Sequence, residues 1–157
     1  MKIAIGSDKS GFLLKEAIVN YFKENNIEFE DLGTTDIENP SPFFVVAPKV
    51  AEAITSGNFD KGILCCGTGM GMSLAANKHR GIFAACCESV FSAKMCRAVN
   101  DVNVLCMGGW ITADWMGVEM AKAFLGTEFT QDLEEWRKEW LKNAKVKMAE
   151  LEEKIYS

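Results

Sequence analysis

Short apolar segments alternate with longer segments of helical periodicity along most of this chain, and this alternation constrains the fold more than any other feature. Buried strands are expected at 3–6, 61–66, 82–86 and 102–107, and an outer strand with one solvated face at 27–32. Helices are expected at 11–25, 43–56, 71–77, 89–99, 112–124 and 130–156. The alternation predicts an α/β fold with a parallel sheet covered on both faces.

Two helix starts follow from the chemistry of single residues. Proline is tolerated mainly in the first turn of a helix, so Pro48 indicates that the second helix begins nearer Val46 than Phe43. A threonine hydroxyl can accept the free N–H groups at a helix start, so Thr112 is expected to cap the helix that follows it.

The composition is that of one domain spanning residues 1–157. Apolar residues make up 48% of the chain and charged residues 25%, which suffices for a buried core. The net charge of −5 argues against a nucleic-acid partner, because phosphate backbones attract an excess of Lys and Arg. No apolar run approaches the roughly 20 residues that cross a bilayer, and the first residues lack a signal-peptide pattern. We therefore expect a cytoplasmic protein whose partners include neither a membrane nor a nucleic acid.

Residues 130–157 are expected to form a C-terminal helix that is too long for the small sheet beneath it. Its apolar residues form one stripe: Leu133, Trp136, Trp140, Leu141, Ala144, Met148 and Leu151. This stripe could cover the parent domain or a second subunit. Tryptophan is enriched in interfaces, which favours a subunit interface and a homo-oligomer.

Cysteine and histidine restrict the available chemistry. The six cysteines stand at 65, 66, 86, 87, 96 and 106, and no pair has the C-x-x-C spacing of a zinc or redox site. Adjacent residues of a strand point to opposite faces, so we expect reduced and mostly buried thiols rather than disulfides. The one histidine, His79, lies in a polar connection and is expected to face solvent. Neither a metal nor a cofactor is expected.

Polar and glycine-rich segments follow three of the predicted strands, at 7–9, 66–71 and 88–89. Ligands of open parallel sheets bind at the carboxyl ends of the strands, so these segments are candidates for one site. The segment at 66–71 is the strongest candidate. Its glycines allow backbone N–H groups to converge on an anion, and the following helix adds its positive end.

Cys66 stands where that loop begins, and the same dipoles are expected to lower the pKa of its thiol. A thiolate beside an anion-binding loop suits proton abstraction next to a carbonyl, because the base removes a C–H proton and the loop stabilises the resulting enediolate. Asp8 and Lys9 could bind hydroxyls or a charged tail. Each of these residues also has a plainer interpretation. The glycine-rich turn could only allow the next helix to pack closely, and Cys66 could be a core residue. Asp8 could cap the next helix, and Lys9 could simply be solvated.

Five stretches of the sequence carry a family resemblance. They are MKIAIGSD at 1–8, GT at 33–34, VAEA at 50–53, GILCCGTGMGMS at 62–73 with ANK at 76–78, and NDVNVL at 100–105. In this order they resemble the ribose-5-phosphate isomerase B and galactose-6-phosphate isomerase family, from residue 1 to about residue 130. The string C-G-T-G-x-G-x-S followed by A-N-K is highly specific.

The resemblance implies a Rossmann-like three-layer α/β/α sandwich with a five-stranded parallel sheet. It also implies homodimers or homotetramers with active sites between subunits. The implied reaction is aldose–ketose isomerisation of a phosphorylated sugar through an enediolate, without metal or cofactor.

Site residues are implied position by position. Cys66 matches the catalytic base of many members, and Thr68 is expected to stabilise the anion with the loop amides. Asp8 matches an acid that contacts sugar hydroxyls, and Asn100 a substrate-binding amide. The remaining substrate-binding candidates are Lys9, Gly67, Gly69, Met70, Gly71 and Arg137, with Lys9 and Arg137 expected to hold the acidic tail.

Four positions depart from the family pattern. Lys9 stands where histidine is usual, Phe43 where tyrosine is usual, and Trp110 where an arginine follows the fifth strand. Val99 replaces the histidine that helps to open the sugar ring. Ring opening therefore needs another group, or the substrate arrives in its open-chain form. A four-carbon sugar phosphate, another unusual sugar phosphate or an unphosphorylated sugar fits as well as ribose 5-phosphate.

Two further hypotheses remain open beside the isomerase. The chain could be a non-catalytic binding module, or a partner subunit of a heteromeric isomerase that keeps the anion-binding loop. Alternatively, Cys66 could act as a covalent nucleophile in a different reaction on the same scaffold.

Overall fold

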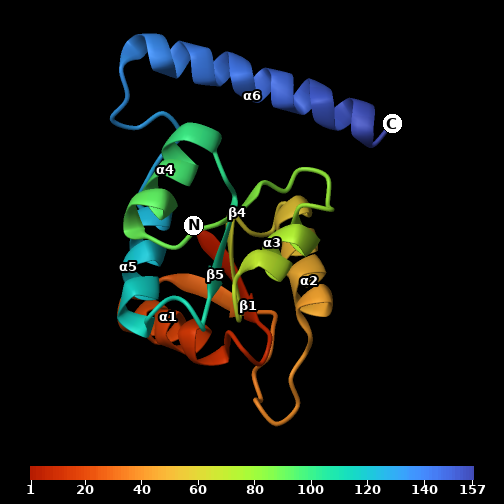
Figure 1. The fold of residues 1–157 in the computed structure, drawn as a ribbon, viewed down its shortest axis with the longest axis vertical. Helices are drawn as coiled ribbons and strands as arrows, with labels where there is room; N and C mark the ends of the chain where they lie inside the picture. The colour runs from red at the N-terminus through yellow and green to blue at the C-terminus, as the bar shows by residue number, and fades with distance from the viewer.

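Five parallel strands form one sheet: β1 (Lys2–Ser7), β2 (Glu28–Asp31), β3 (Lys61–Cys66), β4 (Ala84–Cys86) and β5 (Val104–Gly108). The computed structural model describes residues 1–157, and the strand order across the sheet is β2-β1-β3-β5-β4 (Figure 1). Each pair of neighbouring strands is parallel. All five predicted strands are therefore present, although β4 and β5 begin two residues later than expected.

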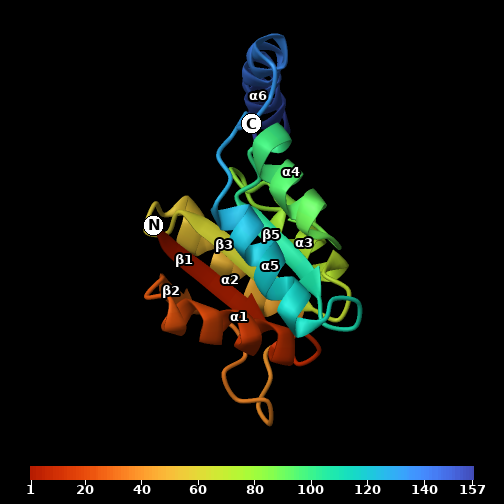
Figure 2. The ribbon, with the colours of Figure 1, turned by 90° about the vertical axis from the view of Figure 1, so that its left-hand side faces the viewer.

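Six helices accompany the sheet: α1 (Phe12–Glu24), α2 (Phe43–Thr55), α3 (Met70–Ala76), α4 (Val90–Asn100), α5 (Asp114–Leu125) and α6 (Glu135–Ile155). Helices α1, α4 and α5 pack on one face of the sheet, and α2 and α3 on the other (Figures 1 and 2). The predicted three-layer α/β/α sandwich is confirmed. None of the helices is both long enough and apolar enough to cross a membrane.

Alternating residues of the strands supply two separate apolar clusters. Ile3 and Ile5 of β1 join the cluster that faces α1, α4 and α5, whereas Ala4 joins the cluster that faces α2 and α3. All three side chains are fully buried. This alternation is the period-two pattern of a strand covered on both faces.

The expected shift of the second helix towards Val46 is wrong. Helix α2 begins at Phe43, so Pro48 lies inside it. A proline at this position removes the hydrogen bond that its N–H would donate to the carbonyl four residues earlier, at Phe44. Phe44 is exposed, so water can solvate that carbonyl and the helix continues.

Two other expectations at helix starts are corrected. Ala113, not Thr112, precedes α5, and the hydroxyl of Thr112 is buried without a hydrogen-bond partner. The C-terminal helix begins at Glu135 rather than near 130, because Thr130 and Asp132 adopt left-handed backbone conformations with φ of +66° and +58°. A right-handed helix cannot pass through such residues.

Helix α6 lies across the amino ends of the strands, beyond α4 and apart from the sheet (Figures 1 and 2). Leu141 is its one buried residue, and Trp136 and Trp140 are 66% and 63% exposed. Polar contacts attach α6 to the rest of the chain, between Gly81 and Glu152, Arg80 and Glu153, and Asp101 and Lys145. Most of the predicted apolar stripe is therefore uncovered in the single chain.

Candidate active site

Two loops that follow neighbouring central strands are joined by backbone hydrogen bonds. Cys66 pairs with Gly108 in the register of β3 and β5, so the loops after the two strands start side by side. The N–H of Gly109 donates to the carbonyl of Cys66 at 2.7 Å, and the N–H of Trp110 donates to the carbonyl of Gly67 at 2.9 Å. The glycine-rich loop is thus fixed by the loop after β5.

The sulfur of Cys66 is held inside the glycine-rich loop. The backbone N–H of Gly69 donates to the Cys66 Sγ at 3.1 Å, and the residue is 5% exposed. The sulfur is therefore a hydrogen-bond acceptor within the loop. Cys66 is also a member of the buried apolar cluster under α2 and α3.

Gly69 is required by the shape of this loop. Its φ is +78°, in the left-handed region that residues other than glycine seldom adopt. A Cβ at this position would lie 2.9 Å from the Sγ of Cys86 and 2.9 Å from the carbonyl carbon of Met107. The left-handed turn is what directs the Gly69 N–H back towards Cys66.

The remaining loop residues surround the start of α3. The hydroxyl of Thr68 accepts the N–H of Met70 at 3.3 Å, and Met70 is 52% exposed. A Cβ at Gly71 would lie 3.2 Å from the ring of Phe43, which therefore packs against the first turn of α3. The predicted residues 66–71 thus form one continuous structure around the sulfur.

Asp8 and Lys9 follow β1 at the same end of the sheet. The carboxylate of Asp8 accepts the N–H of Gly11 at 3.0 Å, so Asp8 does shape the start of α1. Lys9 is exposed. Their loop adjoins the loop after β5, because a Cβ at Gly109 would lie 2.6 Å from the carbonyl oxygen of Ser10. Three loops therefore meet at the carboxyl ends of β1, β3 and β5.

Asn100 and Arg137 lie elsewhere in the chain. Asn100 is the last residue of α4, which runs antiparallel to the strands and so ends at their amino ends. Arg137 is in the first turn of α6, beside Glu134 and over the ring of Trp136. Within one chain, neither residue is brought to Cys66.

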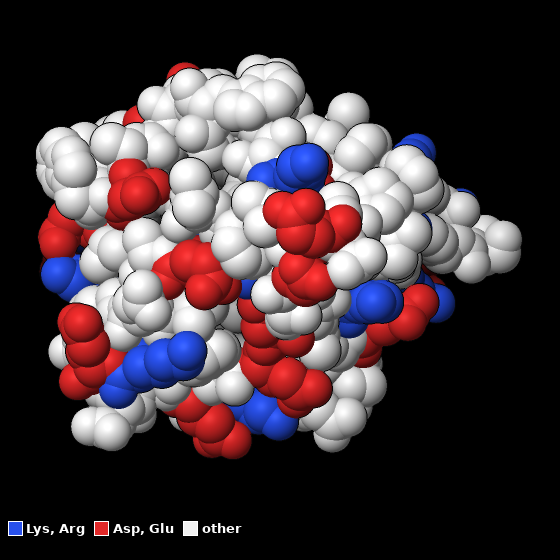
Figure 3. Space-filling view, turned by 90° about the horizontal axis from the view of Figure 1, so that it is seen from below, with Lys and Arg blue, Asp and Glu red and all other residues white.

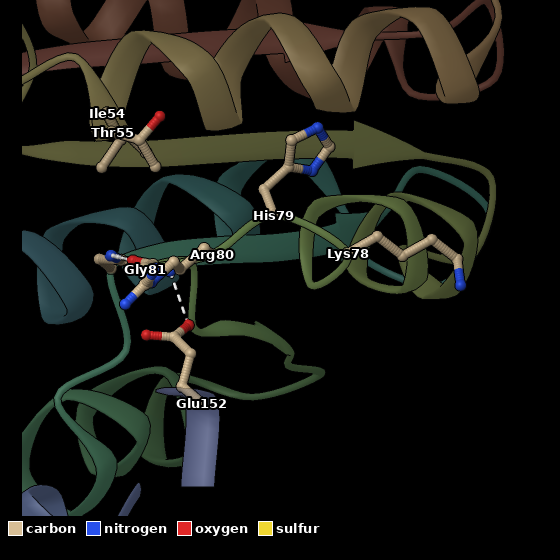
Figure 4. Close-up of a pocket in the computed structure, with 8 residues that line it drawn as sticks. Ile54, Thr55, Lys78, His79, Arg80, Gly81 and Glu152 are labelled. Atoms are coloured by element: carbon tan, nitrogen blue, oxygen red, sulfur yellow. Dashed lines mark hydrogen bonds between the residues drawn. The ribbon is translucent and has the colours of Figure 1, made fainter. Parts of the chain in front are cut away.

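Two cavities lie at the amino ends of the strands. One of about 900 Å³ lies between α6 and the body of the chain and is lined by Val99, Asn100 and Trp140, among others. Another, of about 810 Å³, contains His79 beside Arg80 and is closed by Glu152, whose carboxylate accepts the Gly81 N–H at 2.6 Å (Figure 4). Neither cavity includes Cys66. The chemistry nevertheless favours the loop at 66–71, because Cys66 is the one cysteine whose sulfur accepts a backbone N–H.

The surface at the carboxyl ends of the strands carries both positive and negative side chains. Lys and Arg side chains are scattered among acidic ones, and uncharged surface separates them (Figure 3). This face shows no continuous basic surface of the kind that binds nucleic acid.

The other thiols differ from Cys66 in their surroundings. Burial raises the pKa of Cys65 and of Cys106, which points to inert core residues. A hydrogen bond with Cys96 lowers the pKa of Cys87, but Cys87 is 4% exposed and lies in the core cluster. Five of the six thiols are buried, as expected.

Cys86 is the exposed thiol, and no motif in the sequence connects it with the site. Its Sγ donates to the carbonyl of Thr68 at 3.4 Å, within the glycine-rich loop. Burial raises the pKa of Cys86. Its position at the end of a predicted strand is the one signal that could have placed it near the loop.

Comparison with known proteins identifies the family to which this chain is similar. Residues 3–140 match the model of the Ribose/Galactose Isomerase family. A 4-deoxy-4-sulfo-D-erythrose isomerase of Clostridium sp. (strain MSTE9) is 56% identical over 156 residues, covering 99% of this chain and 98% of that protein. Ribose-5-phosphate isomerase B of Escherichia coli (strain K12) is 43% identical, covering 82% of this chain and 85% of that protein. The structure of Clostridium thermocellum ribose-5-phosphate isomerase B superposes with a TM-score of 0.88 at 38% identity, and 100% of each chain is covered.

Proposed function

The chain belongs to the ribose/galactose isomerase family, and from that premise we propose that it interconverts the aldose and ketose forms of a four-carbon sugar with a sulfonate at C4. As an isomerase related to ribose-5-phosphate isomerase B, it catalyses an aldose–ketose isomerisation. The proposed substrate pair is 4-deoxy-4-sulfo-D-erythrose and the corresponding erythrulose. The observation that carries the catalytic part is the Gly69 N–H on the Cys66 sulfur.

The proposed mechanism uses Cys66 as the base. Its thiolate removes the proton from C2 of the open-chain aldose, and the electrons of that C–H bond form the C1–C2 double bond of an enediolate. The amides of the loop and the Thr68 hydroxyl stabilise the negative oxygen. The Cys66 thiol then returns a proton to C1, which gives the 2-ketose, while a proton moves from the C2 hydroxyl to the C1 oxygen. Asp8 would orient hydroxyls of the sugar.

A tetrose with a substituent in place of its C4 hydroxyl does not need the ring-opening histidine that Val99 replaces. Furanose closure of erythrose needs the C4 hydroxyl, and a sulfonate on C4 removes that hydroxyl. Such a sugar remains open-chain, so no residue is needed to open a ring. The valine in place of the family's usual histidine therefore supports a substrate of this kind.

The degree of sequence identity supports the sulfonate. The chain is 56% identical to the sulfo-erythrose isomerase and 43% identical to the ribose-5-phosphate isomerase B of E. coli. The higher identity favours a shared substrate class.

The separation of Asn100 from Cys66 supports an active site shared between two copies. Asn100 lines the groove of about 900 Å³ beneath α6, at the end of the sheet opposite Cys66. In a two-fold dimer, the loop at 66–71 of one copy can face the groove of the other, and the reverse contact forms at the same time. The exposed Trp136 and Trp140 of α6 would be covered in such a dimer.

The direct test is isomerisation in D₂O, followed by proton NMR. The substrates are 4-deoxy-4-sulfo-D-erythrose, D-erythrose 4-phosphate and D-ribose 5-phosphate. We expect conversion of the sulfonate sugar with deuterium entering at the position of proton transfer, and little conversion of the ring-forming ribose 5-phosphate. Cys66→Ala should lower kcat by about 10²- to 10⁴-fold.

His79→Ala serves as the matched control, because it removes the one imidazole of the chain at the opposite end of the sheet. Its kcat should stay within about threefold of the native value. A native rate in Cys66→Ala would remove Cys66 as the base. Binding of the sugar without any exchange would instead favour the non-catalytic subunit.

A further inference from the structure

Exposed apolar side chains lie beside the glycine-rich loop. The side chains of Trp110, Met70 and Phe43 are 74%, 52% and 37% exposed, although each adjoins the loop. Exposed aromatic rings beside a candidate site provide contact area with little conformational entropy to lose. Trp110 is the largest and most exposed of the three.

The indole of Trp110 lies against Gly67, the residue after the proposed base. A Cβ at Gly67 would lie 2.7 Å from the ring atoms Cδ2 and Cε2, so the ring occupies space that any other residue at 67 would fill. One face of the indole is therefore against the loop backbone while the remainder is open. The backbone of residue 110 is fixed beside the loop, because the Trp110 backbone N–H donates to the Gly67 carbonyl at 2.9 Å.

Lys9 supplies the one positive charge of the three loops. The loops comprise residues 8–11, 67–69 and 109–113, and Lys9 is their single Lys or Arg. The contact between Gly109 and the carbonyl of Ser10 brings the Lys9 loop next to the Trp110 loop. Within the chain, this part of the site thus combines one ammonium with a broad apolar wall.

We infer that Trp110 is a specificity-determining residue that selects a singly charged tail over a doubly charged one. The inference rests on the proposed function and concerns the tail of the substrate rather than the reacting carbons. A dianion loses more hydration beside an apolar wall than a monoanion does, and one ammonium compensates only one charge. A sulfonate carries one negative charge, whereas a phosphate monoester carries about two at neutral pH.

The test compares two four-carbon aldoses that differ at the tail, 4-deoxy-4-sulfo-D-erythrose and D-erythrose 4-phosphate. In the native protein at pH 7.5, kcat/KM for the sulfonate sugar should exceed kcat/KM for the phosphate sugar. Trp110→Arg adds a guanidinium that can bind phosphate in bidentate fashion, and should shift the ratio towards the phosphate by about 10- to 100-fold. Trp110→Phe retains an apolar wall and should keep the ratio within about threefold.

Trp115→Arg is the matched control, because it makes the same exchange at an exposed tryptophan in the first turn of α5. It should leave the ratio unchanged. An equal shift in Trp115→Arg would attribute the effect to net charge and overturn the inference, as would an unchanged ratio in a folded Trp110→Arg.

A second arm needs no variant and covers the case in which Trp110→Arg fails to fold. The second ionisation of a phosphate monoester has a pKa of about 6, so the tail of the phosphate sugar is mostly a monoanion at pH 5. The native preference for the sulfonate should shrink there, and ionisations of the free enzyme cancel in the ratio of kcat/KM. A preference that does not change between pH 7.5 and pH 5 would contradict the inference. If the native protein fails to convert the sulfonate sugar at all, the proposed function fails instead.

Discussion

The backbone N–H of Gly69 reaches the Sγ of Cys66 at 3.1 Å because Gly69 adopts a left-handed conformation with φ of +78°. A side chain at 69 would strain the backbone by about 1–2 kcal/mol and would collide with Met107 and Cys86. We predict that Gly69→Ala lowers kcat by at least about tenfold, since the loop must open and the N–H then moves away from sulfur. Steady-state kinetics would record the change.

Gly57 offers a matched control for this substitution. Its φ is +79°, but nothing lies within 4 Å of a Cβ at that position. Gly57→Ala should cost about 1 kcal/mol of stability from backbone strain and leave kcat unchanged. Equal activity losses in the two variants would mean that the loop geometry at Gly69 has no special role.

A shared active site can be tested by mixing two inactive variants. Cys66→Ala and Asn100→Ala would each disable both sites of a homodimer. Mixed dimers would contain one site with both lesions and one intact site, so random reassembly should restore about a quarter of the native activity. Mixing Cys66→Ala with Thr68→Ala, whose lesions lie in one loop, should restore none; recovery in that mixture would argue against the shared site.

The buried ammonium of Lys15 is expected to be essential for stability. Its side chain is fully buried, and Nζ contacts Asp31 at 2.5 Å, Glu16 at 2.7 Å and the carbonyl of Thr34 at 2.8 Å. Lys15→Met leaves the Asp31 carboxylate without its cation, which should destabilise the fold by about 3–5 kcal/mol. For a chain of this length that corresponds to a fall in Tm of roughly 10 °C, measurable by calorimetry. Lys23→Met, on the exposed side of the same helix, should change Tm by less than about 2 °C.

Asp101 should make stability depend on pH in the acid range. Burial raises the pKa of its carboxyl, but hydrogen bonds from Lys145 and Arg97 outweigh burial and hold the pKa below its ordinary value. A carboxyl whose pKa is lowered by folding stabilises the protein above its unfolded pKa, and this contribution is lost as the pH falls through the folded value. Asp101→Asn keeps the left-handed backbone with little strain, because asparagine tolerates positive φ.

The difference in free energy of unfolding between native protein and Asp101→Asn should therefore be largest near pH 7. It should diminish below about pH 4, where the native carboxyl begins to be protonated. Urea denaturation at a series of pH values measures this difference. A constant difference from pH 7 to pH 3 would show that the charge of Asp101 contributes nothing.

The sequence predicts the layers of this fold well because the buried strands and amphipathic helices have distinct periods. The helix starts are harder to predict. Pro48 is tolerated because the carbonyl it leaves unbonded is at the exposed Phe44, and exposure of one carbonyl cannot be inferred from neighbouring residues. The start of α6 depends on positive φ at Thr130 and Asp132, a conformation that is uncommon for residues other than glycine.

The candidate site is predictable where it is local and not where it is distributed. The loop at 66–71 is contiguous in the chain, so its glycines and Cys66 can be grouped from the sequence alone. Contact of Trp110 with Gly67 depends on the register of β5 with β3, which residue patterns do not specify. The location of Asn100 does follow from topology, because a helix after a parallel strand returns to the amino end of the sheet.

Trp110 and Cys66 belong to different strand–loop segments, although two backbone hydrogen bonds hold their loops together. The sulfur of Cys66 is thus held by one segment and the neighbouring indole by another. Replacing the side chain at 110 leaves those backbone bonds in place, so the surface beside the loop can change while the loop that holds Cys66 keeps its backbone bonds. Such modularity makes this scaffold an attractive starting point for redirecting an isomerase to unfamiliar sugars by changing a single position.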